Sequence, residues 1–297
     1  MQVPTSLFYD NSSRRMSGLN ARAGVLQAQI ATGKKLAAPS DDAVASQQLS
    51  EFRQRDADAK VYGDNMKVAG ALLSQADSTL SDIATQLQRA IELTSLASNG
   101  TLSVDNRRVI GTELSAIVSQ LVDLGNTRDL RGQPLFGSAD GVKAVQRAAD
   151  GSFSFASTTV SPIPIADGQT IQATETAARV FASTGDDIFT VLSTLAARLE
   201  AGTAGTSESS SALDALTAAN DQVALVRSSV GARGARIDLS EAMLTQTNAD
   251  REELRSSLED VDVTAAITEL QKTMTVLQAT QASFAKLSSL SLFSYLR

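Results

Sequence analysis

Hydrophobic residues recur in steps of three and four near both ends of the chain. Near the start, the series consists of Met16, Leu19, Ala23, Leu26 and Ile30. Near the end, it consists of Val263, Ile267, Leu270, Met274, Leu277 and Phe284, with only polar Gln281 breaking the pattern. This spacing predicts amphipathic helices with the seam of a coiled coil. Because chain ends fray unless something holds them, we expect the two ends to pair or to be completed by neighbouring chains.

A heptad repeat runs through residues 62–97. One seam position is held by Tyr62, Ala69, Ala76, Ile83, Ala90 and Ala97, and the other by Met66, Leu73, Leu80 and Leu87. The repeat predicts a helix over about residues 44–99, which at about 1.5 Å per residue is on the order of 80 Å long. We expect Asn99 and Gly100 to end it, because both tolerate the left-handed cap conformation. A second helix is predicted from Ser103 to Gly125 and Asn126.

The pattern changes to short alternating segments after Gly132. We expect strands joined by hairpins, with a turn at Asp167 and Gly168. Pro162 and Pro164 indicate that one of these strands is an edge strand or an irregular arm, since proline cannot donate to a ladder. The predicted strand segments are residues 133–136, 153–155, 160–165 and the vicinity of Ile171.

Helical spacing returns near Asp186, and a stretch rich in Gly, Ser and Thr over residues 201–211 separates this helix from the last long one. Gly231 and Gly234 interrupt that last helix. Each costs about 1 kcal/mol relative to Ala in a helix interior, so they either allow close packing against another helix or mark a bend. We expect close packing.

The order helix, helix, β insert, helix, helix brings the two ends back to each other. We therefore expect a mainly α fold, an elongated antiparallel helical hairpin or bundle with coiled-coil terminal helices and a small β-rich insert. The predicted divisions are an N-terminal helix and connector over 1–42, two parts of a helical rod over 43–132 and 184–257, a β-rich insert over 133–183, and a C-terminal helix over 258–297.

The composition is that of a folded protein with slim helical seams. The chain has 297 residues, of which 42% are hydrophobic but only 4% are aromatic. Its net charge of −7 and its lack of clustered Lys and Arg argue against a nucleic-acid partner, because phosphate binding relies on such clusters. We expect no nucleic acid among its partners.

Histidine and cysteine are both absent. Disulfides, thiolate or imidazole metal sites, cysteine nucleophiles and Ser-His-Asp arrangements are therefore excluded. An Asp/Glu pair or a lysine could still do chemistry, but nothing in the pattern singles one out. We expect no enzyme, no catalytic residue, no metal and no cofactor.

The first ten residues lack the basic segment and apolar core of a secretory signal, and no window approaches 18 uninterrupted apolar residues. We expect no membrane insertion. The protein is predicted to be soluble, or exported by a route that cleaves nothing.

The segment after the first predicted helix has the composition of a connector. Gly33 can stop the helix, and Pro39 forces the residue before it out of the helical region. Ser40 or Asp41 can then cap the next helix, with Asp42 in its electropositive first turn. Such helix stop and start signals can occur between any two helices, and by themselves they do not indicate a function.

The full connector sequence, QIATGKKLAAPSDD over residues 29–42, resembles the corresponding segment of the bacterial flagellin superfamily. Its Pro-Ser-Asp-Asp ending is most similar to that of the hook-filament junction family, the hook-associated proteins of type three. Three further segments carry the resemblance: 227–233 (RSSVGAR), 258–267 (LEDVDVTAAI) and 288–296 (SSLSLFSYL). The resemblance covers roughly residues 1–130 and 186–297 and leaves the insert unmatched.

The resemblance implies a structural protein of the flagellum whose terminal helices form the inner tube of an axial assembly. The implied partners are copies of the chain, hook-side and filament-side axial proteins, and an export chaperone that binds the C-terminal helix. The implied location is extracellular, reached through the flagellar type III export apparatus with an uncleaved N-terminus.

The resemblance also implies which side chains meet other subunits, although for each residue taken alone the simpler role is a core contact within one chain. The predicted subunit-interface residues are Leu19, Leu26, Ile30, Ile267, Leu270, Leu277, Phe284, Leu290, Leu292 and Phe293. The predicted connector motif consists of Gly33, Lys34, Pro39, Ser40, Asp41 and Asp42. We expect the apolar ends to become ordered when neighbouring subunits cover them.

Two other functions stay open on the sequence. The chain could be a flagellin that forms the filament itself. Alternatively, the β insert could carry an enzymatic or ligand-binding function, against which stand the small size of the insert and the absence of His and Cys.

Overall fold

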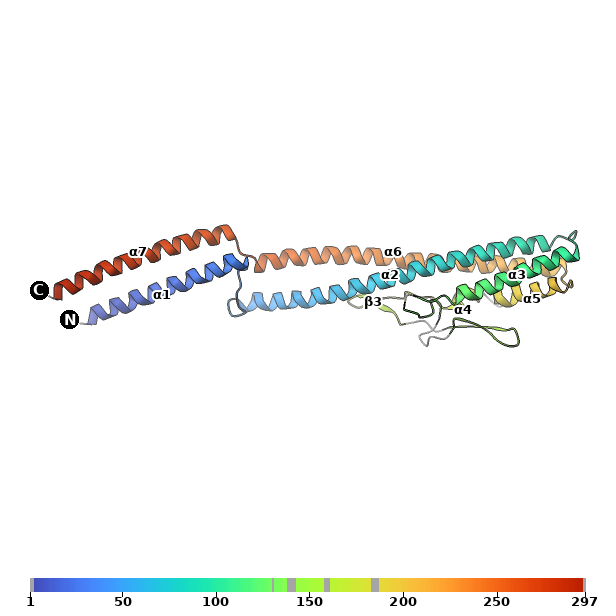
Figure 1. The fold of residues 1–297 in the computed structure, drawn as a ribbon, viewed down its shortest axis with the longest axis horizontal. Coiled ribbons are helices and arrows are strands. Elements are labelled where there is room, and N and C mark those ends of the chain that lie inside the picture. Colours follow the sequence, from blue (N-terminus) through green and yellow to red (C-terminus); the bar gives the residue numbers. More distant parts are fainter. Residues whose placement is uncertain (1–2, 130, 138–142, 158–160, 183–186, 296–297) are drawn as a thin grey trace. The chain divides into compact units, whose positions relative to one another are not determined.

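The computed structural model describes residues 3–129, 131–137, 143–157, 161–182 and 187–295, and side chains within residues 7–286 of these ranges. The described residues form seven helices and four short strands (Figure 1). The helices are α1 (Val3–Thr32), α2 (Ala43–Ala97), α3 (Val104–Gly125), α4 (Ala177–Phe181), α5 (Ile188–Glu200), α6 (Thr206–Glu259) and α7 (Val263–Tyr295). The strands are β1 (Val145–Arg147), β2 (Phe153–Phe155), β3 (Ile163–Ala166) and β4 (Gln169–Ile171). The predicted fold class, mainly α with a small β insert, is confirmed.

The chain divides into two compact units. One consists of residues 1–57 and 246–297, and the other of residues 58–245. The divisions fall inside α2 and α6, so each of these long helices contributes residues to both units. The finer division into five segments stays a prediction.

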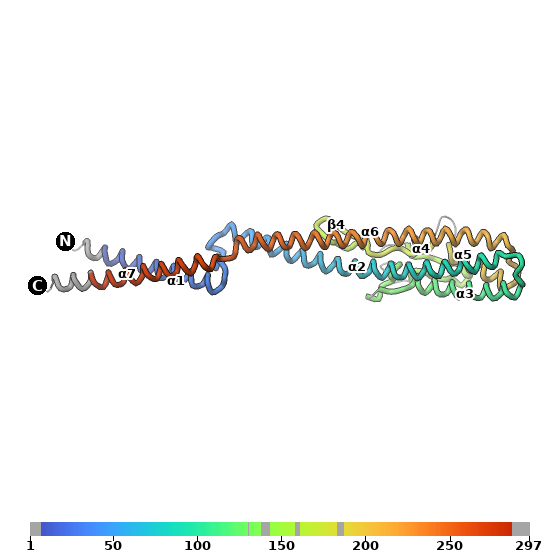
Figure 2. The backbone as a smooth tube through the Cα atoms, turned by 90° about the horizontal axis from the view of Figure 1, so that it is seen from above, coloured from blue at the N-terminus to red at the C-terminus, as the bar shows by residue number. Residues whose placement is uncertain are grey.

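In the first unit, α1 and α7 run antiparallel and side by side (Figures 1 and 2). Arg22 on α1 forms an ion pair of 3.0 Å with Glu269 on α7. Near the other end of the pair, the rings of Tyr9 and Phe284 meet edge to face at 5.3 Å between centroids. The two chain ends are therefore partners within one molecule, as the matching seams predict.

In the second unit, α2, α3, α5 and α6 surround one apolar core. The predicted heptad positions of α2 from Met66 to Ala97 are all buried, and Tyr62 is partly buried. On α6, Arg227 reaches across to Asp77 of α2 at 3.1 Å. Gly111 lets α3 approach α5 closely, because a Cβ there would lie 2.8 Å from the carbonyl oxygen of Ala196.

The end of α2 differs from the prediction. The helix stops at Ala97, and neither Asn99 nor Gly100 adopts a left-handed conformation. Instead the side chain of Asn99 accepts hydrogen bonds from the backbone N–H and the hydroxyl of Thr101, at 3.1 and 2.8 Å. A side-chain turn thus replaces the predicted cap. Ser103 does cap α3 as predicted, accepting from the N–H of Asn106.

The prediction for α6 is wrong in two respects. The helix begins at Thr206 rather than near residue 211, because Glu208 accepts a hydrogen bond from the N–H of Gly205 and caps the first turn. Gly231 and Gly234 do not pack closely within the chain. A Cβ at either position would find nothing within 4 Å, so neither glycine is required by a neighbour that the structure describes.

The insert contains two separate antiparallel hairpins, β1 with β2 and β3 with β4. The predicted turn at Gly168 is present, with φ of +64°. The register shifts between Pro164 and Ala166, which confirms the predicted irregular arm. Residues 133–136 form a turn rather than a strand, with Leu135 and Phe136 buried in the core. Val160, at the start of another predicted strand segment, lies outside the described residues.

A buried segment, residues 171–177, fastens the insert to α6. The carboxylate of Glu175 is only 4% exposed and pairs with Arg233 of α6 and with Arg179 of α4. Arg233 also donates to the carbonyl oxygen of Gln172 at 2.7 Å. Burial lowers the pKa of the Arg233 guanidinium. The insert therefore contacts the helical core through charged as well as apolar groups.

Among the helices described, none combines the length and the apolar character that crossing a bilayer requires.

Candidate assembly surface at the paired chain ends

The two connectors that follow α1 and precede α7 are joined by backbone hydrogen bonds. Gly33, at φ of +71°, ends α1 as predicted, and its carbonyl oxygen accepts from the N–H of Val261 at 3.0 Å. The N–H of Lys35 donates to the carbonyl oxygen of Glu259 at 2.6 Å. Between them, the ammonium of Lys34 pairs with the Glu259 carboxylate. This ladder links segments more than 220 residues apart in the sequence.

The two adjacent aspartates of the connector have separate roles. Asp41 holds the loop, because its Oδ2 accepts from the N–H groups of Ala37 and Ala38 at 3.0 and 2.8 Å. Asp42 caps α2, because its Oδ1 accepts from the N–H groups of Val44 and Ala45 at 3.1 and 3.0 Å. The predicted cap at Ser40 or Asp41 is thus displaced by one or two residues.

Pro39 and Ser40 are exposed on the outside of this connector. The N–H of Asp41 donates to the carbonyl oxygen of Ala38 at 3.0 Å, so the chain turns around the two residues. A turn held by an aspartate and stiffened by proline loses little conformational entropy when a partner binds. The predicted motif is therefore a fixed feature of the surface.

The predicted interface residues fall into three groups. Six of them are half-buried, on helices whose main described partner is the other terminal helix: Leu19, Leu26, Ile30, Leu270, Leu277 and Phe284. Ile267 faces outwards and is 41% exposed. Leu290, Leu292 and Phe293 lie in α7, but outside the residues whose side chains the structure describes.

Ile267 belongs to an apolar stripe on the flank of α7, which we call the α7 stripe. It consists of Val263, Ile267 and Met274, each 41–43% exposed. Their spacing of four and seven residues places them on one line, beside the line that packs on α1. The apolar face of α7 is therefore wider than α1 covers.

A second link in this unit was not expected from the sequence. Arg251 of α6 pairs with Asp56 of α2 at 2.5 Å, and its side chain is only 11% exposed. Nearby, a hydrogen bond to Glu252 raises the pKa of Arg255. Glu259, the partner of Lys34, was likewise missed as a partner. The only sequence signal was the motif around residue 258, which does not reveal which charges pair.

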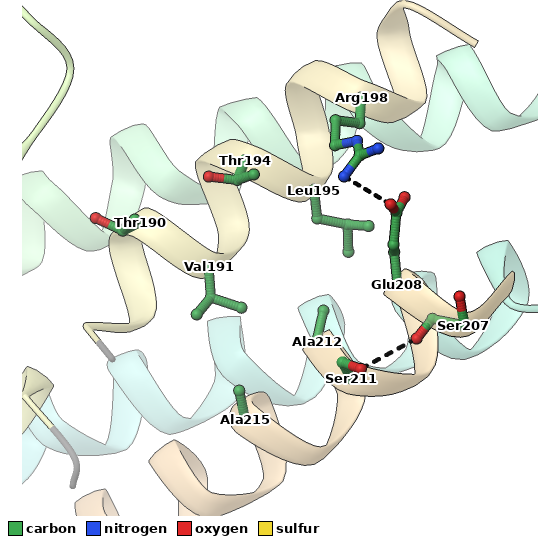
Figure 3. A pocket seen from close by; sticks show the side chains of 10 residues that line it. All are labelled: Thr190, Val191, Thr194, Leu195, Arg198, Ser207, Glu208, Ser211, Ala212 and Ala215. Atoms are coloured by element: carbon green, nitrogen blue, oxygen red, sulfur yellow. Dashed lines mark hydrogen bonds and ion pairs between the residues drawn. The ribbon is translucent and has the colours of Figure 1, made fainter. Parts of the chain in front are cut away.

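One open groove, of about 510 Å³, lies between α2 and α3 and is lined mainly by polar residues, among them Asp82 and Asp123. A groove of about 400 Å³ lies between α5 and α6 (Figure 3). Its charged residues, Arg198 and Glu208, pair with each other at 2.6 Å, and its other lining residues are Ser, Thr and aliphatic side chains. Within the described part of the chain, no three Asp or Glu side chains cluster as a metal site would require.

The regions that contain the paired chain ends match a known protein family. Residues 4–140 match the bacterial flagellin N-terminal helical region, and residues 213–296 match the bacterial flagellin C-terminal helical region. The chain belongs to the bacterial flagellin family. Both matched regions contain a terminal helix and its connector, so the flagellin-type helices are those that form the paired ends.

Individual proteins of the flagellin family are similar to this chain over most of its length. The chain is 26% identical to flagellar hook-associated protein 3 of Salmonella typhimurium over 99% of both chains. It is 25% identical to flagellin of Listeria monocytogenes over 84% of this chain and 83% of that one. The crystal structure of flagellar hook-associated protein 3 from Legionella pneumophila has the same fold. It is 14% identical with a TM-score of 0.61, and the match covers 75% of this chain and 99% of that one.

Proposed function

We propose that this chain is a structural subunit of the bacterial flagellum that joins the hook to the filament. The observation that carries the proposal is the pair of terminal helices, which bury one apolar face against each other and leave the α7 stripe uncovered. The near full-length relationship to hook-associated protein 3 supports the junction role over that of a filament flagellin.

In this role the terminal helices assemble with copies of the chain and with axial proteins on the hook side and the filament side. Fully burying an aliphatic side chain contributes about 1.5–3 kcal/mol. Each residue of the α7 stripe is still nearly half exposed, so burial by a neighbouring subunit would contribute close to half of that free energy per residue. We include Leu290, Leu292 and Phe293 in this surface, because they are the apolar residues near the C-terminal end of α7. The half-buried residues, such as Leu19 and Leu277, would serve both α1–α7 pairing and assembly.

The connector motif from Gly33 to Asp42 would fix the point in the chain at which the paired helices α1 and α7 join the rest of the molecule. Its exposed turn at Pro39 and Ser40 offers a rigid contact to a neighbouring subunit. The motif itself is held by Asp41 and by the ladder to Glu259, so it does not depend on a neighbour for its shape.

Delivery to the flagellum is part of the proposal. We infer export through the flagellar type III apparatus, without cleavage, to the extracellular face of the cell. A chaperone that covers the C-terminal helix would prevent the α7 stripe from associating before export. We infer no enzymatic role, and detectable hydrolysis by the full chain would contradict this.

The experiment that tests the proposal is gold labelling of the chain on isolated flagella. The junction role predicts labelling confined to a short zone at the distal end of the hook. Labelling along the whole filament would instead establish a filament flagellin. A second readout is whether the purified chain grows long filaments on its own, since sustained growth contradicts the junction role.

A further inference from the structure

The turn between α2 and α3 (Figure 1) carries Asn99, Gly100 and Thr101, all of them exposed. Nowhere else in the chain does a glycine follow an asparagine. In such a pair the backbone nitrogen of the glycine can reach the side-chain amide carbon of the asparagine, because the glycine has no Cβ to hinder the approach. The pair can therefore react within the chain if both atoms are free to meet.

The nitrogen of Gly100 is free to react. Among the described residues, none accepts a hydrogen bond from its N–H, and a Cβ at Gly100 would meet nothing within 4 Å. The other asparagines differ, because a hydrogen bond holds the N–H of the residue that follows each of them. After Asn126, the N–H of Thr127 donates to the carbonyl oxygen of Leu124 at 3.1 Å. The rest lie inside helices, where the next N–H belongs to the helix ladder: Asn11, Asn20, Asn65, Asn106, Asn220 and Asn248.

The side-chain amide of Asn99 is held in an orientation that favours attack on its carbon. Thr101 donates both its N–H and its hydroxyl to Oδ1 of Asn99, at 3.1 and 2.8 Å. Attack on the amide carbon places negative charge on this oxygen, and donors already aimed at it stabilise that charge, as in an oxyanion hole. Thr101 therefore activates the same group that Gly100 can attack.

We propose that this turn is a site of self-modification, at which Asn99 is converted without an enzyme to aspartate and isoaspartate. The nitrogen of Gly100 forms a bond to Cγ of Asn99, the bond from Cγ to Nδ2 breaks, and the proton from the Gly100 N–H leaves with Nδ2 as ammonia. The cyclic imide then takes up one water molecule. Opening of the imide at Cγ gives aspartate. Opening at the main-chain carbonyl carbon gives isoaspartate, in which the chain continues through the side chain.

The turn also suits both products. Asp150, Gly151 and Ser152 already show the aspartate arrangement, because Oδ1 of Asp150 accepts from the N–H and the hydroxyl of Ser152 at 2.9 and 2.7 Å. In isoaspartate, the free carboxylate forms at the present main-chain carbonyl of Asn99, whose oxygen accepts from Nη2 of Arg107 at 3.2 Å. The new charge therefore arises beside a guanidinium, and a charge-assisted hydrogen bond stabilises it. Either product adds one negative charge to the net charge of −7.

Peptide mapping by mass spectrometry tests the conversion on the purified full-length chain, kept folded at mildly alkaline pH over several weeks. The peptide that contains Asn99 is expected to acquire the mass of an acid in place of an amide and to separate into an aspartate and an isoaspartate form. The peptides that contain Asn20 and Asn126 should stay unchanged. An unchanged Asn99 peptide, or equal conversion at Asn20 or Asn126, overturns the proposal.

Three variants of the turn supply a second readout. Gly100→Ala hinders the attacking nitrogen, and Thr101→Val removes one of the two donors to Oδ1. Ser98→Ala is the matched control, because the Ser98 hydroxyl donates to the carbonyl oxygen of Ser95 and not to Asn99. All three positions lie outside the helices, so the thermal midpoint should change little. Conversion should slow at least about tenfold for Gly100→Ala and at least about threefold for Thr101→Val, and keep the original rate for Ser98→Ala.

Unfolding in guanidinium chloride separates the effect of the folded turn from that of the sequence. The unfolded chain keeps Asn99 and Gly100 as neighbours but loses the hydrogen bonds from Thr101. Thr101→Val should therefore convert as fast as the original chain when both are unfolded, and more slowly only when both are folded. Equal rates for the two folded chains would show that Thr101 does not promote the reaction, and would overturn the proposal.

Discussion

The carboxylate of Glu175 is the most heavily paired charge in the core of the second unit. It accepts from Arg179 at 3.1 Å through both oxygens and also pairs with Arg233 of α6. A buried pair of this kind is costly to break from one side, because the remaining charge stays buried without a counter-charge. Glu175 is therefore the main charged contact between this segment and α6, beside the hydrogen bonds from Arg233 to Gln172 and from Gln222 to Arg179.

Replacing that carboxylate should destabilise the second unit. Glu175→Gln is expected to lower the free energy of unfolding by about 3–5 kcal/mol, measured by urea denaturation followed by circular dichroism. The double variant Glu175→Leu with Arg233→Met removes both charges and should recover most of the loss. An unchanged midpoint for Glu175→Gln would show that the two arginines find other partners.

Asp129 gives the second unit a pH dependence. Burial disfavours its charge, but hydrogen bonds from the N–H of Gln133 and from Arg131 outweigh this and lower its pKa below the ordinary value of 3.8. A lowered pKa means that the contribution is fully present above pH 3.8 and is lost as the pH falls through the lowered value.

Asp129→Asn should therefore flatten the acid limb of the stability curve. The expected result is a smaller loss of the unfolding free energy below pH 4 than in the original chain, measured by urea denaturation at each pH. Hydrogen bonds from Ser152 also lower the pKa of the exposed Asp150, so Asp150→Asn should flatten the same limb. An acid limb as steep for Asp129→Asn as for the original chain would contradict the role of Asp129.

At the scale of the elements, long heptads could be predicted from the sequence and local departures from them could not. The spacing of the hydrophobic residues alone predicts that α2 and α6 are helices, and it also predicts which face of each helix lies in the core. By contrast, β1 and α4 have three and five residues and carry little periodic signal. The buried position of Glu175 could not be predicted because it depends on Arg233, 58 residues away in the sequence.

A substitution in the α7 stripe should impair assembly without impairing folding. Ile267→Asp changes a side chain that is 41% exposed, so helical content and thermal midpoint should change little. Incorporation into flagella should fall at least about tenfold, because a charge replaces an apolar contact with the neighbouring subunit. The measurement is quantitative immunoblotting of isolated flagella.

Thr268→Asp is the control for that prediction, since Thr268 is exposed next to Ile267 but points away from the α7 stripe. Equal loss of incorporation in both variants would mean that any added charge on α7 blocks assembly. Normal incorporation of Ile267→Asp would remove the α7 stripe from the subunit interface.

At the scale of the whole molecule, the paired ends and the unit of residues 58–245 should be separable. The core residues of the second unit all lie within that range, so its folding does not require α1. Deleting residues 1–36 removes the partner of α7 and all three residues that the connector ladder joins to residues 259 and 261. The truncated chain is expected to keep a protease-resistant fragment near residues 58–245 and to lose incorporation completely. Assembly of the truncated chain would contradict the role of the paired ends.

The ladder between Gly33 and Val261 also fixes the helical phase of both ends. Each residue turns an α-helix by about 100°. The direction in which an α7 side chain points therefore depends on how many residues separate it from Val261. One residue inserted after Thr264 would therefore rotate Ile267 and Met274 out of line with Val263 and bring different side chains against α1. An inserted heptad would restore the phase, so the paired ends should tolerate changes of length in sevens far better than in ones.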